Sequence, residues 1–90
     1  MLYALICDDK PGALEIRKAT RDAHLDYIRT TGVVAEAGPL LDSAGEMAGS
    51  LVVLDVPDLA AAEAWAANDP YAAAGLFARV AIRPWKKVIG

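Results

Sequence analysis

The hydrophobic positions of this chain fall into four short runs separated by polar segments and by two segments that favour helix. Short apolar runs bounded by turn residues are typical of buried strands. They predict strands at residues 2–7, 33–41, 49–56 and 76–85. The polar, glycine-containing stretch at 42–46 predicts a hairpin loop between the second and third strands.

The two helices are predicted from their end signals. The first runs from about residue 11 to Gly32, a residue suited to the left-handed backbone at a helix C-terminus. The second begins at Asp58, a good N-cap, and its alanine-rich sequence continues to Asn68. Pro70 stops that helix, and residues 71–75 are predicted to add one further turn.

The predicted order is β-α-β-β-α-β, the ferredoxin-like split βαβ arrangement of the α+β class. An antiparallel sheet would carry both helices on one face. With 90 residues and no internal repeat, we expect a single domain spanning residues 1–90.

Both faces of the predicted strands are apolar. In the first strand, Tyr3, Leu5 and Cys7 alternate with residues that are equally apolar. Helices on one side leave the second face without cover, although a face exposed to water is normally polar. A second copy of the chain is the commonest solution. We therefore expect a homodimer or higher homo-oligomer, with sheet facing sheet in a dimeric α+β barrel or sandwich.

The last strand differs from the others because it mixes aromatic and charged side chains. Strict alternation would place one set on a common face: Phe77, Arg79, Ala81, Arg83 and Trp85. This face is either a solvated edge or the border of a cavity or interface with anionic contacts.

The charge balance and the single cysteine limit the ligands and the cellular compartment that we expect for this protein. The net charge is −3 and no basic stripe is present, which argues against nucleic-acid binding. A lone cysteine cannot form an internal disulfide. The N-terminus has no basic region typical of a signal peptide, and no apolar stretch is long enough to span a bilayer. We expect a cytoplasmic protein that does not bind membranes.

His24 is the only histidine and the first candidate for acid–base chemistry, because imidazole titrates near neutrality. Helical spacing puts it in one broad stripe with Arg17, Arg21 and Ile28. A separate apolar stripe is expected to pack on the sheet: Ile16, Ala19, Ala23 and Tyr27. His24 would then lie at the border of the buried surface, either as a reactive group or as an ordinary surface histidine.

Two further residues, Asp69 and Pro39, each have two possible roles. Asp69 either caps the helical turn that follows it or reaches the ring of His24, where a carboxylate would fix the tautomer. Pro39 follows Gly38 in the second strand and marks either a pocket border or a plain turn. One histidine and one cysteine make no usual zinc site, and no nucleotide-binding motif occurs, so we expect neither metal nor cofactor.

Several short motifs, in this order and spacing, resemble the YciI-like family, also called the YCII-related domain. They are Arg17, the run from Arg21 to Ile28, Gly32, Ala37-Gly38-Pro39-Leu40, Gly49-Ser50, Asp69-Pro70-Tyr71, Ala74-Gly75-Leu76 and Arg83-Pro84-Trp85. The resemblance implies a ferredoxin-like fold, a dimeric α+β barrel and an active-site pair at His24 and Asp69.

Two functions remain open from the sequence, beside a purely structural dimer domain in which His24 is exposed and unpaired. The first is a small cofactor-independent lyase or isomerase. His24 would transfer a proton, Asp69 would orient it, and a small anionic or phenolic substrate would meet Arg17, Arg21, Pro39 and Tyr71. The second is a non-catalytic module that binds a small anion or a partner enzyme through the same cleft.

Overall fold

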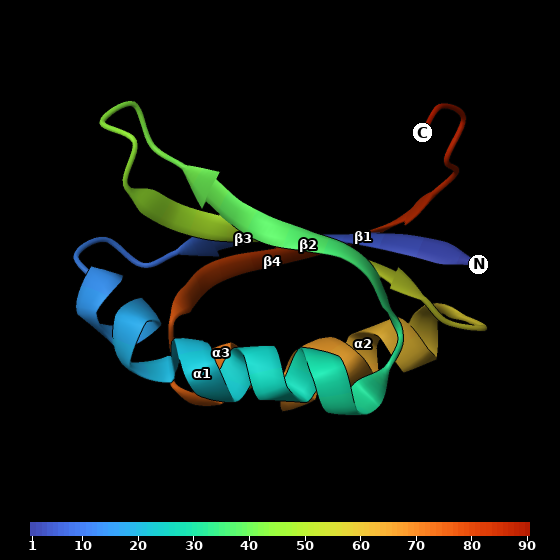
Figure 1. The fold of residues 1–90 in the computed structure, drawn as a ribbon, viewed down its shortest axis with the longest axis horizontal. Coiled ribbons are helices and arrows are strands. Elements are labelled where there is room, and N and C mark those ends of the chain that lie inside the picture. Colours follow the sequence, from blue (N-terminus) through green and yellow to red (C-terminus); the bar gives the residue numbers. More distant parts are fainter.

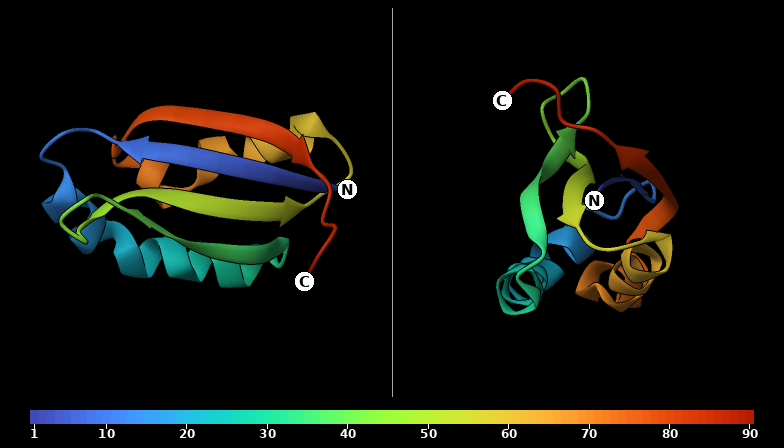
Figure 2. Two further views of the ribbon diagram at one scale, coloured as in Figure 1. Left: turned by 90° about the horizontal axis from the view of Figure 1, so that it is seen from above. Right: turned by 90° about the vertical axis from the view of Figure 1, so that its right-hand side faces the viewer.

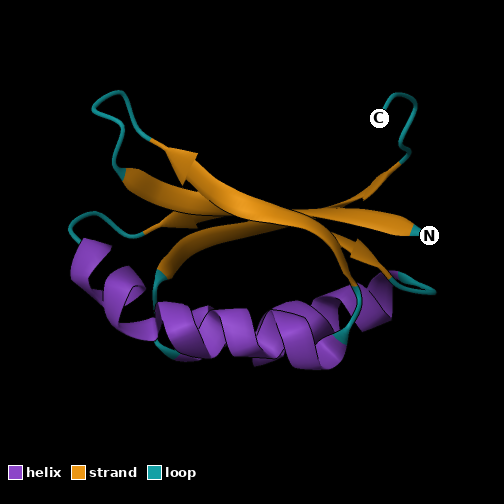
Figure 3. Cartoon of the chain, viewed as in Figure 1, coloured by secondary structure: helices purple, strands orange, loops and turns teal.

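The strands form one antiparallel sheet, and all the helices lie against one of its faces (Figure 1, Figure 3). The structure, a computed structural model, describes residues 1–90. Its elements are β1 (Leu2–Asp9), α1 (Leu14–Thr31), β2 (Val34–Leu41), β3 (Met47–Asp55), α2 (Leu59–Asn68), α3 (Pro70–Ala73) and β4 (Phe77–Trp85). None of these helices is long and apolar enough to cross a membrane.

The sheet has the order β2-β3-β1-β4, so β1 lies in the middle and pairs with both β3 and β4. The two β-α-β units are therefore interleaved, which confirms the ferredoxin-like arrangement and the α+β class. Helices α1 and α2 run side by side beneath the sheet (Figure 2). We call the sheet face that the helices do not cover the outer face.

The core lies between the sheet and α2. Tyr3, Leu5 and Cys7 of β1 point toward the helices and are buried with alternate residues of β3. From α2, Ala62 and Trp65 close this layer. Its members alternate along each strand, as expected for a sheet with one face against helices.

The helix ends follow the predicted signals. The Asp58 carboxylate accepts a hydrogen bond from the backbone N–H of Ala61 at 2.8 Å, and Gly32 adopts a left-handed backbone with φ of 67°. The first helix begins at Leu14 rather than near residue 11, and no side chain caps its N-terminus. Pro70 starts α3, so the further turn lies one residue earlier than predicted.

The stripe of α1 that packs inward is not the one expected from hydrophobicity. Ile16 is 40% exposed, and Ala19 and Ala23 are also exposed, whereas Arg17 and His24 are buried. The expectation was wrong because buried carboxylates on other elements receive these two polar side chains. Tyr27, the fourth member of the predicted stripe, is partly buried.

Tyr27 also holds α1 beside α2. Its hydroxyl donates to the backbone carbonyl of Trp65 at 2.9 Å, and the Trp65 indole N–H donates to Thr31 at 3.0 Å. These bonds fix the two helices relative to each other near the C-terminal end of α1. The remainder of α1 is left to face the sheet through polar side chains.

Strict alternation also fails at the start of β4. Asp8 pairs with Arg79 but Asp9 pairs with Phe77, so a bulge at Ala78 reverses the alternation. Phe77 consequently packs against the buried residues beneath the sheet. Beyond the bulge, the predicted pattern holds, and the outer face receives Arg79, Ala81, Arg83 and Trp85.

Candidate active site

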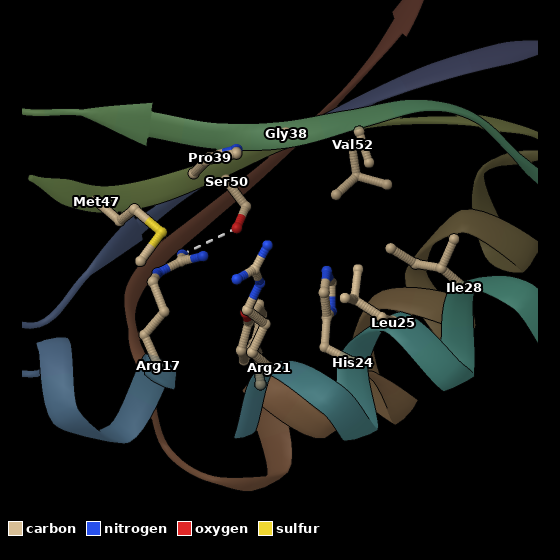
Figure 4. A pocket seen from close by; sticks show the side chains of 12 residues that line it. Arg17, Arg21, His24, Leu25, Ile28, Gly38, Pro39, Met47, Ser50 and Val52 are labelled. Atoms are coloured by element: carbon tan, nitrogen blue, oxygen red, sulfur yellow. Dashed lines mark hydrogen bonds between the residues drawn. The ribbon is translucent and has the colours of Figure 1, made fainter. Parts of the chain in front are cut away.

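A cavity of about 210 Å³ lies between α1 and the strands β2 and β3 (Figure 4). It forms where α1 presents long polar side chains to the sheet instead of packing directly on it. Its lining residues are Arg17, Arg21, His24, Leu25, Ile28, Ala37, Gly38, Pro39, Met47, Ser50, Val52 and Tyr71.

His24 and Asp69 are in direct contact although they are far apart in the sequence. The Nδ1 atom of His24 lies 2.8 Å from Oδ1 of Asp69, and both residues are buried, 6% and 3% exposed respectively. The same carboxylate oxygen accepts a bond from the backbone N–H of Tyr71 at 3.0 Å. An ionised carboxylate has no proton to donate, so its contact with His24 assigns the proton of this bond to Nδ1.

This hydrogen bond occupies Nδ1 and leaves Nε2 of His24 as the nitrogen open to a ligand. Nε2 has no hydrogen-bond partner in the chain. Because every fully buried side-chain nitrogen or oxygen has such a partner, Nε2 is not fully buried. Nε2 is therefore accessible from the cavity that His24 lines. With Nδ1 protonated, the lone pair on Nε2 is free to accept a proton.

The position of Asp69 follows from the sequence around it. Pro70 excludes the helical conformation at the preceding residue, and Asp69 is extended with φ of −63° and ψ of 130°. This ends α2 and makes Asp69 the N-cap of α3. The two roles considered from the sequence are thus combined, because one carboxylate caps α3 and holds His24.

Arg17 is buried and paired with Asp9 through its Nε and Nη2 atoms. Its guanidinium donates to both carboxylate oxygens of Asp9 at 2.7 and 2.8 Å and to the hydroxyl of Ser50 at 2.9 Å. Burial acts to lower the pKa of Arg17, but the hydrogen bonds and charge of Asp9 outweigh it and raise that pKa. Because Asp9 balances its charge, Arg17 shapes the cavity wall more than it supplies a net charge.

Arg21 lines the same cavity but, unlike Arg17, is not buried. It is exposed and makes no ion pair or hydrogen bond within the chain. Figure 4 shows its side chain projecting from α1 between those of Arg17 and His24. Arg21 therefore gives the cavity an uncompensated positive charge.

Tyr71 packs behind these groups. Its ring stacks on the His24 imidazole with centroids 4.0 Å apart and an interplanar angle of 19°. The Arg17 guanidinium carbon lies 4.7 Å from the centroid of the same ring. Burial raises the pKa of the Tyr71 phenol, although the nearby charge of Arg17 opposes the shift. Tyr71 is thus a neutral hydrogen-bond donor at physiological pH.

The residues predicted to form the site meet here, whereas the aromatic and arginine face of β4 does not border this cavity. Arg17, Arg21, His24, Pro39 and Tyr71 line the cavity, and Asp69 lies directly behind His24. Their functional roles stay predictions. No group of three or more histidine, cysteine or acidic side chains is placed to hold a metal ion.

Sequence reasoning did not assign roles to Asp9 and Ser50. Ser50 accepts a hydrogen bond from Arg17, which leaves its own proton free to be donated into the cavity. A signal was present, since Ser50 is a polar residue directly before a run of four apolar residues, 51–54. Asp9 was missed because the predicted strand ends at residue 7, whereas β1 continues to Asp9 and its alternation places that side chain on the same face as Cys7.

Solved structures resemble this fold over nearly its whole length. The 5-chloro-2-hydroxyhydroquinone dehydrochlorinase TftG from Burkholderia phenoliruptrix AC1100, in complex with 2,5-dihydroxybenzoquinone, is 29% identical. Its TM-score is 0.88, and the match covers 96% of this chain and 94% of that one. An antibiotic biosynthesis monooxygenase, 16% identical with a TM-score of 0.61 over 99% and 100% of the two chains, shares the fold.

The sequence matches relatives over nearly the full length of both chains. It is 40% identical over 97 aligned positions to protein YciI of Escherichia coli O6:H1 strain CFT073 and of Shigella flexneri, covering 98% of this chain and 99% of each relative. An uncharacterized protein of Haemophilus influenzae is 36% identical with the same coverage. The profile of the YCII-related domain matches residues 1–86. The resemblance found in the motifs is therefore confirmed, and the chain belongs to the YCII-related family.

Proposed function

We propose that this protein is a small enzyme in which His24 exchanges a proton with a small anionic or phenolic substrate, in a lyase- or isomerase-type reaction. The observation that carries this proposal is the 2.8 Å contact between Nδ1 of His24 and Asp69, which leaves Nε2 facing the cavity. A base held by a carboxylate on its far side is a recurrent arrangement for proton transfer.

In the proposed step, Nε2 of His24 accepts a proton from the substrate. In an elimination, the electron pair released expels the leaving group as an anion. In an isomerisation, the same proton returns to a different atom. Asp69 stabilises the imidazolium that forms, because its carboxylate lies against the protonated Nδ1. Since it also accepts from the Tyr71 backbone, Asp69 does not need to reorient during the step.

The cavity favours a small ligand with negative charge. Drug-sized ligands occupy pockets of roughly 300–1,000 Å³, whereas this one measures about 210 Å³. Arg21 is the group available to an anion, because Asp9 already neutralises Arg17. The hydroxyls of Ser50 and Tyr71 add neutral hydrogen-bonding groups.

The likeness to TftG supports a hydroxylated ring as the substrate class. That protein is a dehydrochlorinase of 5-chloro-2-hydroxyhydroquinone and binds 2,5-dihydroxybenzoquinone. A ring with two acidic hydroxyls can hold one as a phenolate against Arg21 and keep the other as the proton donor to Nε2 of His24.

The test uses those two compounds as probes. Binding of 2,5-dihydroxybenzoquinone is followed by titration, and chloride release is followed with 5-chloro-2-hydroxyhydroquinone. His24→Gln and Asp69→Asn should lower turnover by about 10²- to 10⁴-fold. Arg21→Gln should mainly weaken binding. Asp22→Asn, a charge change on an exposed position of α1, serves as the control.

Two results would contradict the proposal. One is turnover that survives His24→Gln unchanged. The other is tight binding of the probe without turnover of this or any related phenol, lost in Arg21→Gln but kept in His24→Gln. The second result would instead identify a binding module.

We also propose that the protein is a homodimer whose copies meet through the outer face. Ile6 and Leu51 lie in the middle of that face, 39% and 40% exposed, and Trp85 is 40% exposed at its edge. Large apolar side chains gathered on one uncovered sheet face are typical of an interface.

A further inference from the structure

The cavity beside His24 has two chemically different ends. Its basic and hydroxyl-bearing side chains gather on one side of His24, and its branched aliphatic side chains gather on the other (Figure 4). The polar end is formed by Arg17, Arg21 and Ser50, and the apolar end by Leu25, Ile28 and Val52. Met47 lies beside Arg17 at the polar end and adds no charge there.

The two ends are distinct because both walls of the cavity change character in the same direction. Along α1, Ile28 follows Arg21 by seven positions, a rise of about 10 Å. Along β3, Ser50 and Val52 share a face and lie about 7 Å apart. Figure 4 shows Arg21 and Ser50 on the same side of the imidazole. A single substituted ring fits between the two ends.

The polar end suits an oxyanion. Arg21 supplies a positive charge that no carboxylate of the chain neutralises. Ser50 is 4% exposed, and its hydroxyl accepts a hydrogen bond from Arg17 at 2.9 Å, so its own proton is available to an oxygen in the cavity. Because Asp9 holds the Arg17 guanidinium, this orientation of Ser50 is set before a ligand binds.

The apolar end suits an uncharged substituent. The side chains of Leu25, Ile28 and Val52 offer no hydrogen-bond donor or acceptor. A charged group placed among them would lose its hydration without a replacement hydrogen bond. A methyl group or a similar apolar substituent would instead be stabilised by leaving water.

We propose that the substrate lies along this axis, with an oxyanion between Arg21 and Ser50 and an uncharged apolar substituent against Ile28 and Val52. This rests on the proposed function and deepens it, because it specifies how the ring is oriented at His24. A ring hydroxyl between the two ends then faces Nε2. Ser50 selects for the oxyanion, and Ile28 limits the size of the substituent.

The experiment measures equilibrium binding to the full chain by titration. The probes are 2,5-dihydroxybenzoquinone and its 3-methyl and 3-propyl derivatives. The 3-methyl derivative should bind the parent chain about fourfold more tightly than the unsubstituted ring, the value of one buried methyl group. The 3-propyl derivative should bind more weakly than the 3-methyl derivative, because Ile28 limits the space.

Two variants address the two ends. Ile28→Ala enlarges the apolar end and should shift the ratio of propyl to methyl affinity by about tenfold in favour of propyl. Ile16→Ala makes the same change at an exposed position of α1 and should leave the ratio unchanged. Ser50→Ala should weaken binding of every probe by about tenfold or more without altering the ratio. Its control is Ser43→Ala in the exposed hairpin loop.

The outcomes separate this orientation from the proposed function, because binding requires no turnover. A propyl-to-methyl ratio that is the same in Ile28→Ala and Ile16→Ala would overturn the orientation, and so would undiminished binding by Ser50→Ala. Turnover unaffected by His24→Gln would overturn the proposed function and leave the affinity ratios standing. Failure of every probe to bind at millimolar concentration would overturn the ring as ligand class and the orientation with it.

Folding of the variants is controlled separately. Circular dichroism on each variant establishes that the fold is retained. Ile28→Val removes less of the side chain and should shift the ratio in the same direction as Ile28→Ala by a smaller factor. It therefore gives the same test if the alanine variant does not fold.

Discussion

Replacing Arg17 by methionine should destabilise the fold by several kcal/mol, because it leaves the Asp9 carboxylate buried without a counter-charge. The two side chains are 3% and 6% exposed and are joined by two hydrogen bonds. Removing one member of such a pair typically costs about 3–5 kcal/mol. The loss of the bond to Ser50 should add little, since its hydroxyl faces the cavity and can bond to water there.

That loss is large for a domain of 90 residues. Typical stabilities of about 0.05–0.15 kcal/mol per residue give roughly 5–14 kcal/mol in total. At about 4–8 °C of Tm per kcal/mol, Arg17→Met should lower the Tm by at least about 12 °C. Urea unfolding followed by circular dichroism measures the free energy directly.

A double-mutant cycle with Asp9→Asn assigns the effect to the pair. The double variant has no stranded charge, so it should be much more stable than the sum of the single losses predicts. Arg29 and Asp26 form a matched control on the same helix, because they pair on the surface with side chains 67% and 69% exposed. Breaking that pair should cost only about 0.2–0.5 kcal/mol. A loss below about 1 kcal/mol in Arg17→Met, or additive losses in the cycle, would refute the reasoning.

Three further predictions concern the scaffold. Gly49→Ala should destabilise the fold by about 1–3 kcal/mol in urea unfolding, because a Cβ there would lie 2.3 Å from the Cys7 carbonyl oxygen. Gly38→Ala is the control, since open space surrounds that position, and it should change stability by at most about 0.5 kcal/mol. Equal losses in the two variants would contradict this prediction. Burial raises the pKa of the Cys7 thiol from 9.0 to about 12, so the unfolded chain loses this proton first and stability should fall as the pH rises between those values; a slope unchanged in Cys7→Ala would count against it. Asp58→Ala should cost about 1 kcal/mol by removing the α2 N-cap, and calorimetry showing no fall in Tm would exclude that role.

Much of the fold could be predicted from local signals. Three helix-end signals act within a few residues, so they can be predicted from the local sequence. They are the N-cap at Asp58, the left-handed residue Gly32 and the helix-ending residue Pro70. The strand bounds follow for the same reason, because apolar runs and turn residues are local. The structure moves the predicted ends by only a few residues.

The errors arose where a distant element decided the outcome. Periodicity indicated that Ile16, Ala19 and Ala23 would pack inward, yet the carboxylates that bring Arg17 and His24 inside lie on β1 and before α3. Likewise, the bulge in β4 depends on its pairing with β1 and turns Phe77 to the other face. Neither partner is visible within one segment of sequence.

One part of the candidate site could be predicted from helical spacing, and the other part only from the family motifs. Helical spacing alone placed Arg17, Arg21 and His24 together, because residues on one stripe of a helix share a face. The contact between His24 and Asp69 spans 45 positions, so no spacing rule contains it. The family motifs supplied that pair, and the structure provides the distance between its atoms.

The inward side of α1 has a consequence for redesign of this domain. Its buried arginine and histidine are each matched to one acid on another element, Asp9 on β1 and Asp69 before α3. Each basic side chain depends on its own acid, so grafting the cavity into another scaffold requires all four residues together. The outward stripe of Ile16, Ala19 and Ala23 has no such counterparts and is the side of α1 open to labels, tethers or solubilising substitutions.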